Sequence, residues 1–256
     1  EIKRMKAEID LHFGPAKEWT NTLGMKLVLV PAGGFTMGSP ASEDGRYADE
    51  GPPHPVRITE AFYLGAYEVT QEEYEKVMEA NPSGVKGPRN PVAPVSWNQA
   101  TAFCEELSQR EGNTCRLPTE AEWEYACRAG STTRFCFGEE EGGLEAYAWY
   151  DANAGNQAHP VGEKKPNAWS LYDMHGNVWE WCSDGQGKYR AEPQENPKGG
   201  AGPARVNRGG SWQRGARHAR SAHRGWDAPT FTGFPLGFRV VYTLPTRSPG
   251  QPPGDR

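Results

Sequence analysis

The sequence predicts an α+β domain of short strands and peripheral helices, joined by extensive irregular loops. Glycine (31 residues) and proline (22) together make up about a fifth of the 256 residues, well above the usual share of about 12%. Both residues break helices, so this composition argues against a helical bundle. Nine Trp, ten Tyr and nine Phe supply the bulk that can hold long loops in place. Three helix starts are also marked in the sequence.

Strands are predicted where short apolar runs lie between turn residues. Residues 26–30 and 35–38 are separated by Pro-Ala-Gly-Gly, so we expect a hairpin. An acidic, turn-rich loop at 39–55 is expected to be exposed, and strand character resumes at 56–58 and 62–64. Closing strands are predicted at 205–208 and 238–242.

Each predicted helix begins with a capping box, in which a hydroxyl and an acid or amide three residues later satisfy each other's backbone amides. The pairs are Thr70 with Glu73, Ser96 with Gln99, and Thr119 with Glu122. In the second and third helices the apolar positions recur at helical spacing and include Cys104 and Cys127. Both thiols are therefore expected to be packed in a core.

One long stretch, residues 129–205, has few periodic segments and many turn signals, so we expect it to carry a function or to be held by other elements. The sequence divides into a leader or linker at 1–22, one domain at 23–244 and a disordered tail at 245–256.

Net charge and cysteine usage limit the partners and the compartment. A net charge of −5 and a pI near 5.8 give no general attraction to nucleic acid or to an anionic membrane. The five cysteines include no C-x-x-C pair. This pattern is typical of unpaired cysteines that act as small buried apolar residues in a protein of a reducing compartment. This favours a cytoplasmic location and leaves an exported form open.

Seven motifs occur in a fixed order between about residues 23 and 243. They are MKLVLVPAGGFTMGS (25–39), YEVTQ (67–71), PVSW (94–97), RLPTEAEWEYA (116–126), LYDMHGNVWEW (171–181), RGGSW (208–212) and GFR (237–239). In these motifs the chain resembles the formylglycine-generating enzyme family, also called the sulfatase-modifying factor family. The resemblance implies a C-type-lectin-like fold.

That resemblance also implies a chemistry: the family's founding enzyme oxidises a cysteine of sulfatases to formylglycine, with copper held by two thiolates that follow the Gly-Gly-Ser motif. Soft thiolates are the ligands that Cu(I) prefers. In this chain residues 213–220 contain no cysteine, and the nearest, Cys182, lies about thirty residues upstream. Copper and catalytic residues are therefore not expected, and the activity of the founding enzyme is not predicted.

The same comparison implies a calcium site. In the family a calcium ion lies in the segment that matches residues 173–180, which gives Asp173, Gly176, Val178 and Glu180 as ligands in this chain. Oxygen-rich, acidic, glycine-containing turns suit this hard cation. The alternative is that Asp173 begins a tight turn and Glu180 pairs with an arginine.

Six arginines between residues 205 and 224 form a cationic stretch in this acidic chain. Arg208, Arg220, Arg224 and Arg239 resemble scaffold residues of the family that bind carboxylates and loop carbonyls. Gln213, Arg214, Arg217 and His218 have no such role and lie where the family's catalytic loop lies. The residues predicted to face a ligand are these four together with Trp179, Ser211 and Trp212.

The preferred interpretation is a calcium-stabilised binding or regulatory module that presents an arginine-rich cleft to an anionic peptide, a glycan or a partner protein. One alternative is an oxidoreductase of the formylglycine-generating and sulfoxide-synthase superfamily that acts on a cysteine thiol. The histidine ligands of the sulfoxide synthases come largely from a helical domain that this sequence lacks. Another alternative is a variable ligand-binding protein of a diversity-generating system.

Overall fold

A computed structural model describes residues 17–233 and 235–243, and it confirms the α+β class. The largest sheet has five strands in the order β1-β2-β5-β12-β6. These strands are β1 (Glu18–Thr20), β2 (Lys26–Val30), β5 (Phe62–Gly65), β12 (Val241–Thr243) and β6 (Cys115–Arg116). The strand that lies last in the sequence therefore sits inside the sheet, between β5 and β6.

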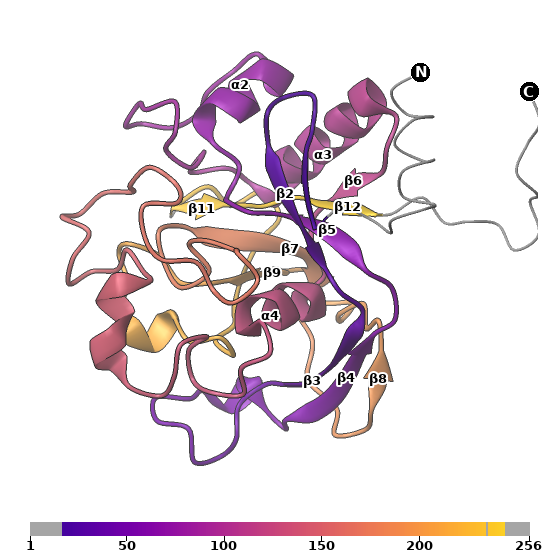
Figure 1. Ribbon diagram of the computed structural model, residues 1–256, viewed down its shortest axis with the longest axis vertical. Helices are drawn as coiled ribbons and strands as arrows, with labels where there is room; N and C mark the ends of the chain where they lie inside the picture. Colours follow the sequence, from indigo (N-terminus) through magenta and orange to yellow (C-terminus); the bar gives the residue numbers. More distant parts are fainter. Residues whose placement is uncertain (1–16, 234, 244–256) are drawn as a thin grey trace, which may run out of the picture.

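Both faces of this sheet are buried, which explains why residues 27–30 are apolar without interruption. Side chains such as Leu27, Tyr63 and Tyr242 belong to one core cluster, which includes residues of α2 (Gln71–Met78) and α3 (Trp97–Glu111). The alternate positions, such as Val28 and Leu64, belong to a second cluster with residues of α4 (Glu120–Arg128). Figure 1 shows α2 and α3 at one end of the molecule and α4 below the β7 and β9 strands.

Two smaller sheets complete the domain. One has the order β10-β9-β7-β11 and consists of β10 (Gly225–Asp227), β9 (Arg205–Arg208), β7 (Trp179–Gly185) and β11 (Leu236–Gly237). The other has the order β3-β4-β8 and consists of β3 (Gly33–Met37), β4 (His54–Ile58) and β8 (Gln194–Glu195). Short 3-10 helices lie at Ala48–Glu50, Glu141–Ala146 and Ala216–His218.

All three predicted helix starts are confirmed. Thr70, Ser96 and Thr119 are the N-caps of α2, α3 and α4, and each capping box has both of its hydrogen bonds. The thiols of Cys104 and Cys127 are buried, as the helical spacing predicts.

The predicted hairpin between residues 26–30 and 35–38 is wrong. β2 already has β1 on one edge and β5 on the other, so β3 cannot pair with it and instead pairs with β4. The domain also starts before residue 23, because β1 is the edge strand of the main sheet and Trp19 packs on Tyr63 and Tyr242. The expected tail at 245–256 lies outside the described residues.

The loop at 39–55 is exposed only in part. Glu50 and His54 are fully buried, because the carboxylate of Glu50 binds the buried guanidinium of Arg220. The stretch at 129–205 is irregular over most of its length, as expected, but it contains the buried strand β7. Within the described ranges no helix is long and apolar enough to cross a membrane.

Candidate functional site

A cleft of about 390 Å³ lies where the loop before β4 meets the chain on either side of β10. Its lining includes aromatic, basic and acidic side chains. These are Tyr47, Asp49, Trp179, Arg214, His218, His223, Arg224, Trp226 and Asp227. Trp226 and Val85 are the exposed large hydrophobic side chains of the described chain, so one of the two stands at this cleft.

Two histidines and a tyrosine pack against one another inside the cleft. The hydroxyl of Tyr47 lies 3.3 Å from Nε2 of His218. The ring of His223 lies 5.0 Å from those of both Tyr47 and His218, and 5.5 Å from Trp179. These contacts join segments that are far apart in the sequence, since Tyr47 precedes β4 and the histidines follow β9.

Both imidazoles are neutral at neutral pH. Burial, together with the nearby Arg214, lowers the pKa of His218. Burial also lowers the pKa of His223 to about 4, even though Glu50 lies 3.4 Å from its Nδ1. Burial alone would raise the pKa of Glu50, but bonds from His223 and Arg220 hold that pKa well below its usual range. The cleft therefore combines uncharged imidazoles with a fixed buried carboxylate.

Two buried polar atoms of the cleft have neither a hydrogen-bond partner nor an ion-pair partner among the described residues, whereas Nδ1 of His223, which also forms no hydrogen bond, lies 3.4 Å from Glu50. The two atoms are Oδ2 of Asp49 and Nδ1 of His218. Buried polar atoms are nearly always paired, with protein, water or a ligand. The cleft thus offers one acceptor and one ring nitrogen to a molecule that enters it.

Four buried arginines, of which Arg224 also lines the cleft, have the scaffold role that the family resemblance implies. Arg208 binds Glu124, and Arg220 binds Glu50. Arg224 binds Glu120, and Arg239 binds Glu180. All four side chains are buried, so they hold loops together and do not form a free anion site.

The structure brings some of the predicted ligand residues together and separates others. Trp179, Arg214 and His218 line the cleft. Trp212 and Gln213 line a neighbouring groove of about 340 Å³ with Val85 and several prolines. Ser211 is buried, and Arg217 lies over the Tyr47 ring while its Nε donates to the Gly45 carbonyl.

A copper–thiolate centre does not fit the residues of this cleft. None of the five cysteines lines it, and four of them are buried elsewhere. Burial raises the pKa of Cys127 to about 12 and the pKa values of Cys104 and Cys182 well above their usual range. Such groups stay protonated at neutral pH, whereas soft-metal binding needs thiolates.

The segment expected to hold calcium is buried and acidic. Both oxygens of Glu180 accept from Arg239, at 2.5 and 2.6 Å, and one also accepts from the Trp123 indole. Oδ2 of Asp173 accepts from the Gly162 amide at 2.7 Å, while Oδ1 is buried without a partner among the described residues. Gly176 has a φ of 153°, and a Cβ there would collide with the Trp149 carbonyl, so only glycine fits.

Glu68 adds a third carboxylate to this segment. It accepts from the Asn177 side chain at 2.7 Å and from the Val178 amide at 3.0 Å. Burial and the neighbouring carboxylates raise its pKa well above the usual range, and burial raises that of Asp173 to about 6. No group of three or more metal-binding side chains is assembled in the described part of the chain. Calcium in this segment remains a prediction.

Sequence reasoning missed Tyr47, Asp49 and Glu50, because the loop that carries them reads as an exposed acidic turn. It also left out His223 and Trp226, and it gave Glu68 no role. Two signals in the sequence could have pointed to these residues. A scaffold arginine such as Arg220 needs an acidic partner, which is Glu50, and Glu68 lies within the YEVTQ motif.

Comparison with known proteins places this geometry in context. The family described as sulfatase-modifying factor enzyme 1-like domain matches residues 13–244. A formylglycine-generating enzyme from Bos taurus is 33% identical over 292 residues, which cover 86% of this chain and 76% of that protein.

Two solved structures are similar over nearly the whole chain. Treponema denticola variable protein 1 has a TM-score of 0.83 and 29% identity, and the match covers 90% of this chain and 100% of that one. PvdO from Pseudomonas aeruginosa has a TM-score of 0.82 and 33% identity, with 89% and 98% covered. These matches confirm the α+β, C-type-lectin-like fold that the sequence motifs imply.

Proposed function

This chain belongs to the family of sulfatase-modifying factor enzyme 1-like domains, and from that premise we propose that it is a binding or regulatory member of the family. Its cleft takes an anionic segment of a peptide, glycan or partner protein. It does so without copper-dependent oxidation of a thiol.

One observation carries this proposal: the cleft is lined by Trp179, Trp226 and Arg214 and by two unpartnered polar atoms, and no cysteine lies in it. Arginine beside aromatic rings suits carboxylate and sulfate groups. The neutral imidazoles of His218 and His223 can accept or donate one hydrogen bond each without a further charge. Arg214 and the rings can therefore hold one anionic group of a ligand, while Oδ2 of Asp49 requires a hydrogen-bond donor from the same ligand.

The experiment compares binding with oxidation in one protein preparation. Fluorescently labelled acidic peptides and sulfated oligosaccharides are titrated into the full chain, and the titration is repeated with Arg214→Gln and Trp226→Ala. We expect each variant to weaken binding about tenfold or more, since a charge-assisted hydrogen bond or a buried ring contributes more than about 1.4 kcal/mol. Equal affinity in both variants would refute the cleft as the site.

The oxidation arm tests the alternative activity. The protein is incubated with a cysteine-containing sulfatase-motif peptide and oxygen, with and without added copper or iron, and the peptide is then weighed by mass spectrometry. An unchanged peptide mass is expected. A mass loss that matches formylglycine would replace the binding proposal by an oxidoreductase.

A calcium ion in the 173–180 segment forms the second part of the proposal. The partnerless Oδ1 of Asp173 and the excess of carboxylates over Arg239 support a cation there. Oxygen ligands and a glycine turn are what calcium requires. Because Glu180 already binds Arg239, Asp173 and Glu68 would supply the charge, with the Gly176 and Val178 carbonyls nearby.

Chelation tests the ion. EDTA should lower the Tm of the wild-type protein, and added Ca²⁺ should restore it, because a ligand that binds only the folded state stabilises by mass action. Asp173→Asn should abolish this response. Glu180→Ala is uninformative alone, since it leaves Arg239 unpaired with or without calcium. A Tm that is the same in EDTA and in Ca²⁺ would remove the ion.

A variable ligand-binding protein is the second candidate function. The likeness to the Treponema denticola variable protein supports it. Gln213, Arg214 and Arg217 lie at or near the cleft, outside the buried scaffold. Replacing these three residues together by alanine should change the Tm by no more than a few degrees, which differential scanning fluorimetry measures. A near-repeat of the coding segment beside the gene would be the genetic sign of variation.

A further inference from the structure

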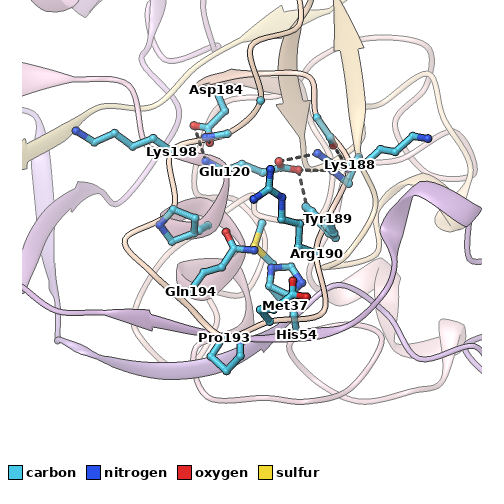
Figure 2. A pocket seen from close by; sticks show the side chains of 17 residues that line it. Met37, His54, Glu120, Asp184, Lys188, Tyr189, Arg190, Pro193, Gln194 and Lys198 are labelled. Atoms are coloured by element: carbon cyan, nitrogen blue, oxygen red, sulfur yellow. Dashed lines mark hydrogen bonds and ion pairs between the residues drawn. The ribbon is translucent and has the colours of Figure 1, made fainter.

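A cavity larger than the cleft lies elsewhere in the described chain. It measures about 710 Å³ and is lined by the segment 187–200, by the start of α4 and by residues of β3 and β4. The cavity and the cleft share a single lining residue, Arg224. Figure 2 shows Met37, His54 and Pro193 on one side of this cavity and Asp184 on the other.

Segment 187–200 is held by hydrogen bonds, by strand pairing and by two arginines from outside the segment, since Arg224 donates to the Gly187 carbonyl at 3.1 Å and Arg57 lies 3.7 Å from Glu195. The Tyr189 hydroxyl donates to Glu120 at 3.1 Å. The Gly199 amide donates to Asp184 at 2.6 Å, and β8 pairs with β4 through Gln194 and Glu195. Close backbone packing adds to this, because a Cβ at Gly200 would collide with the backbone of residues 186 and 187.

The cations of this segment therefore have no part in its attachment. Lys188, Arg190 and Lys198 are exposed, and within the described part of the chain their side chains form no ion pair or hydrogen bond. In Figure 2, Lys188 and Lys198 extend to opposite sides, while Arg190 turns toward the middle of the cavity, where Glu120 lies.

The nearby carboxylates are already occupied. Glu120 accepts from Arg224 at 2.6 and 2.9 Å and from Tyr189. Asp184 accepts from the amides of Glu120 and Gly199 and from the Ser183 hydroxyl. Only the exposed Glu192 remains among the acidic residues that line this cavity, against three free cations. The lining therefore has four cations, which are these three and Arg224, against three carboxylates, so the cavity is slightly cationic although the whole chain is acidic.

We propose that this cavity binds a small molecule that carries a phosphate or sulfate group, with the oxyanion held by Arg190 and flanked by Lys188 and Lys198. The planar guanidinium donates two parallel hydrogen bonds to such an oxyanion. The two lysine side chains extend away from the cavity in Figure 2, but they are exposed, and on binding they turn toward the oxyanion from either side. Met37, Ala121 and Pro193 supply an apolar wall for the rest of the molecule. Two negative charges match three cations better than one does, so a monocarboxylate is disfavoured.

Calorimetric titration of the full chain at low ionic strength tests this site. The probes are inorganic phosphate, pyrophosphate and sulfate, with acetate as the monocarboxylate comparison. We expect pyrophosphate to bind most tightly and Arg190→Gln to weaken its binding at least tenfold. Adding Lys188→Gln and Lys198→Gln to Arg190→Gln should weaken pyrophosphate binding further. Both variants should keep the wild-type Tm, because none of these side chains anchors the segment.

Two matched controls separate this site from general charge and from the cleft. Lys86→Gln removes an exposed cation elsewhere and should bind pyrophosphate like the wild type. Arg214→Gln removes a cation of the cleft, and in this variant the binding event that Arg190→Gln weakens should keep its wild-type affinity. The proposal is overturned if no oxyanion binds, if acetate binds as well as pyrophosphate, or if Arg214→Gln weakens binding as much as Arg190→Gln does. Loss of peptide or glycan binding in the cleft leaves this result unaffected.

Discussion

At Glu180, a carboxylate and a guanidinium are both removed completely from water. The pair with Arg239 is bidentate, and the Trp123 indole and the carbonyls of Gly65 and Tyr172 satisfy the remaining hydrogen-bonding groups. Burying two charges is costly, and only such complete pairing offsets the cost. Removal of one partner should therefore be severe.

We predict that Glu180→Gln lowers the free energy of unfolding by about 3–5 kcal/mol, because it leaves the Arg239 charge buried and unpaired. Urea denaturation measures the loss. Glu72→Gln is the matched control: it breaks the exposed pair with Lys76 and should cost less than about 1 kcal/mol. Similar losses in the two variants would contradict this account of Glu180.

A second prediction concerns the pH dependence of stability, to which Asp184 and His223 contribute in opposite directions. Burial raises the pKa of Asp184 to about 6, so the folded state takes up this proton first and stability from this group falls as pH rises through 6. Burial lowers the pKa of His223 to about 4, so its contribution is lost as pH falls from about 6.5 toward 4.

Replacing either residue should change the slope of stability against pH between about 4 and 6. Asp184→Asn should make stability fall more steeply on acidification, and His223→Gln should make it fall less steeply. Denaturation at several pH values measures both slopes. Parallel curves for the two variants and the wild type would show that neither group has a shifted pKa.

At the scale of single elements, local chemistry determines where the helices begin. The Ser96 hydroxyl accepts from the Gln99 amide at 3.2 Å, and the Gln99 side chain accepts from the Ser96 amide at 2.8 Å. We predict that Ser96→Ala destabilises the protein by about 1 kcal/mol, through loss of this cap at the start of α3. The exposed Ser42→Ala should change stability by less than about 0.5 kcal/mol. Chemical denaturation compares the two, and equal effects would argue against the cap.

The same locality explains which elements the sequence could predict. Each capping box depends on residues three apart, and the run at 26–30 depends on consecutive residues, so both can be recognised from one stretch of chain. Strand pairing depends on distant residues instead. The residues near position 35 do not show that both edges of β2 are occupied. The charged Glu180 makes β7 look unlike a buried strand, because its ion pair with the distant Arg239 is visible only in the structure.

At the scale of the whole molecule, the 39–55 loop is held by the segment after β9. Arg220 reaches across to Glu50 and Glu43, at 2.5–2.7 Å. We predict that Arg220→Gln speeds amide hydrogen exchange at residues 41–50 at least about tenfold, while the amides of α3 keep nearly the wild-type rate. Mass spectrometry of deuterated fragments measures this. Equal acceleration in α3 would show that the whole domain, and not this loop, depends on Arg220.

Part of the candidate site could be predicted from the sequence, and part is visible only in the tertiary structure. The scaffold roles of Arg208, Arg220 and Arg224, and a ligand-facing position for Trp179, were expected from the family resemblance. Tyr47 and Asp49 could not be recognised, because they come from a loop whose burial depends on an arginine about 170 residues away. The cation-rich cavity was not predicted for the same reason, since Met37, His54 and Glu120 come from segments far in sequence from its cations.

The position of β12 has a consequence for synthesis on the ribosome. This strand bridges β5 and β6, so the three N-terminal strands β1, β2 and β5 have no partner on their open edge until residues 241–243 have been made. The nascent chain must therefore keep an unpaired, strongly apolar sheet edge through most of translation, and such edges attract other chains. Truncations that end before residue 241 should be recovered as aggregates and not as shorter folded domains.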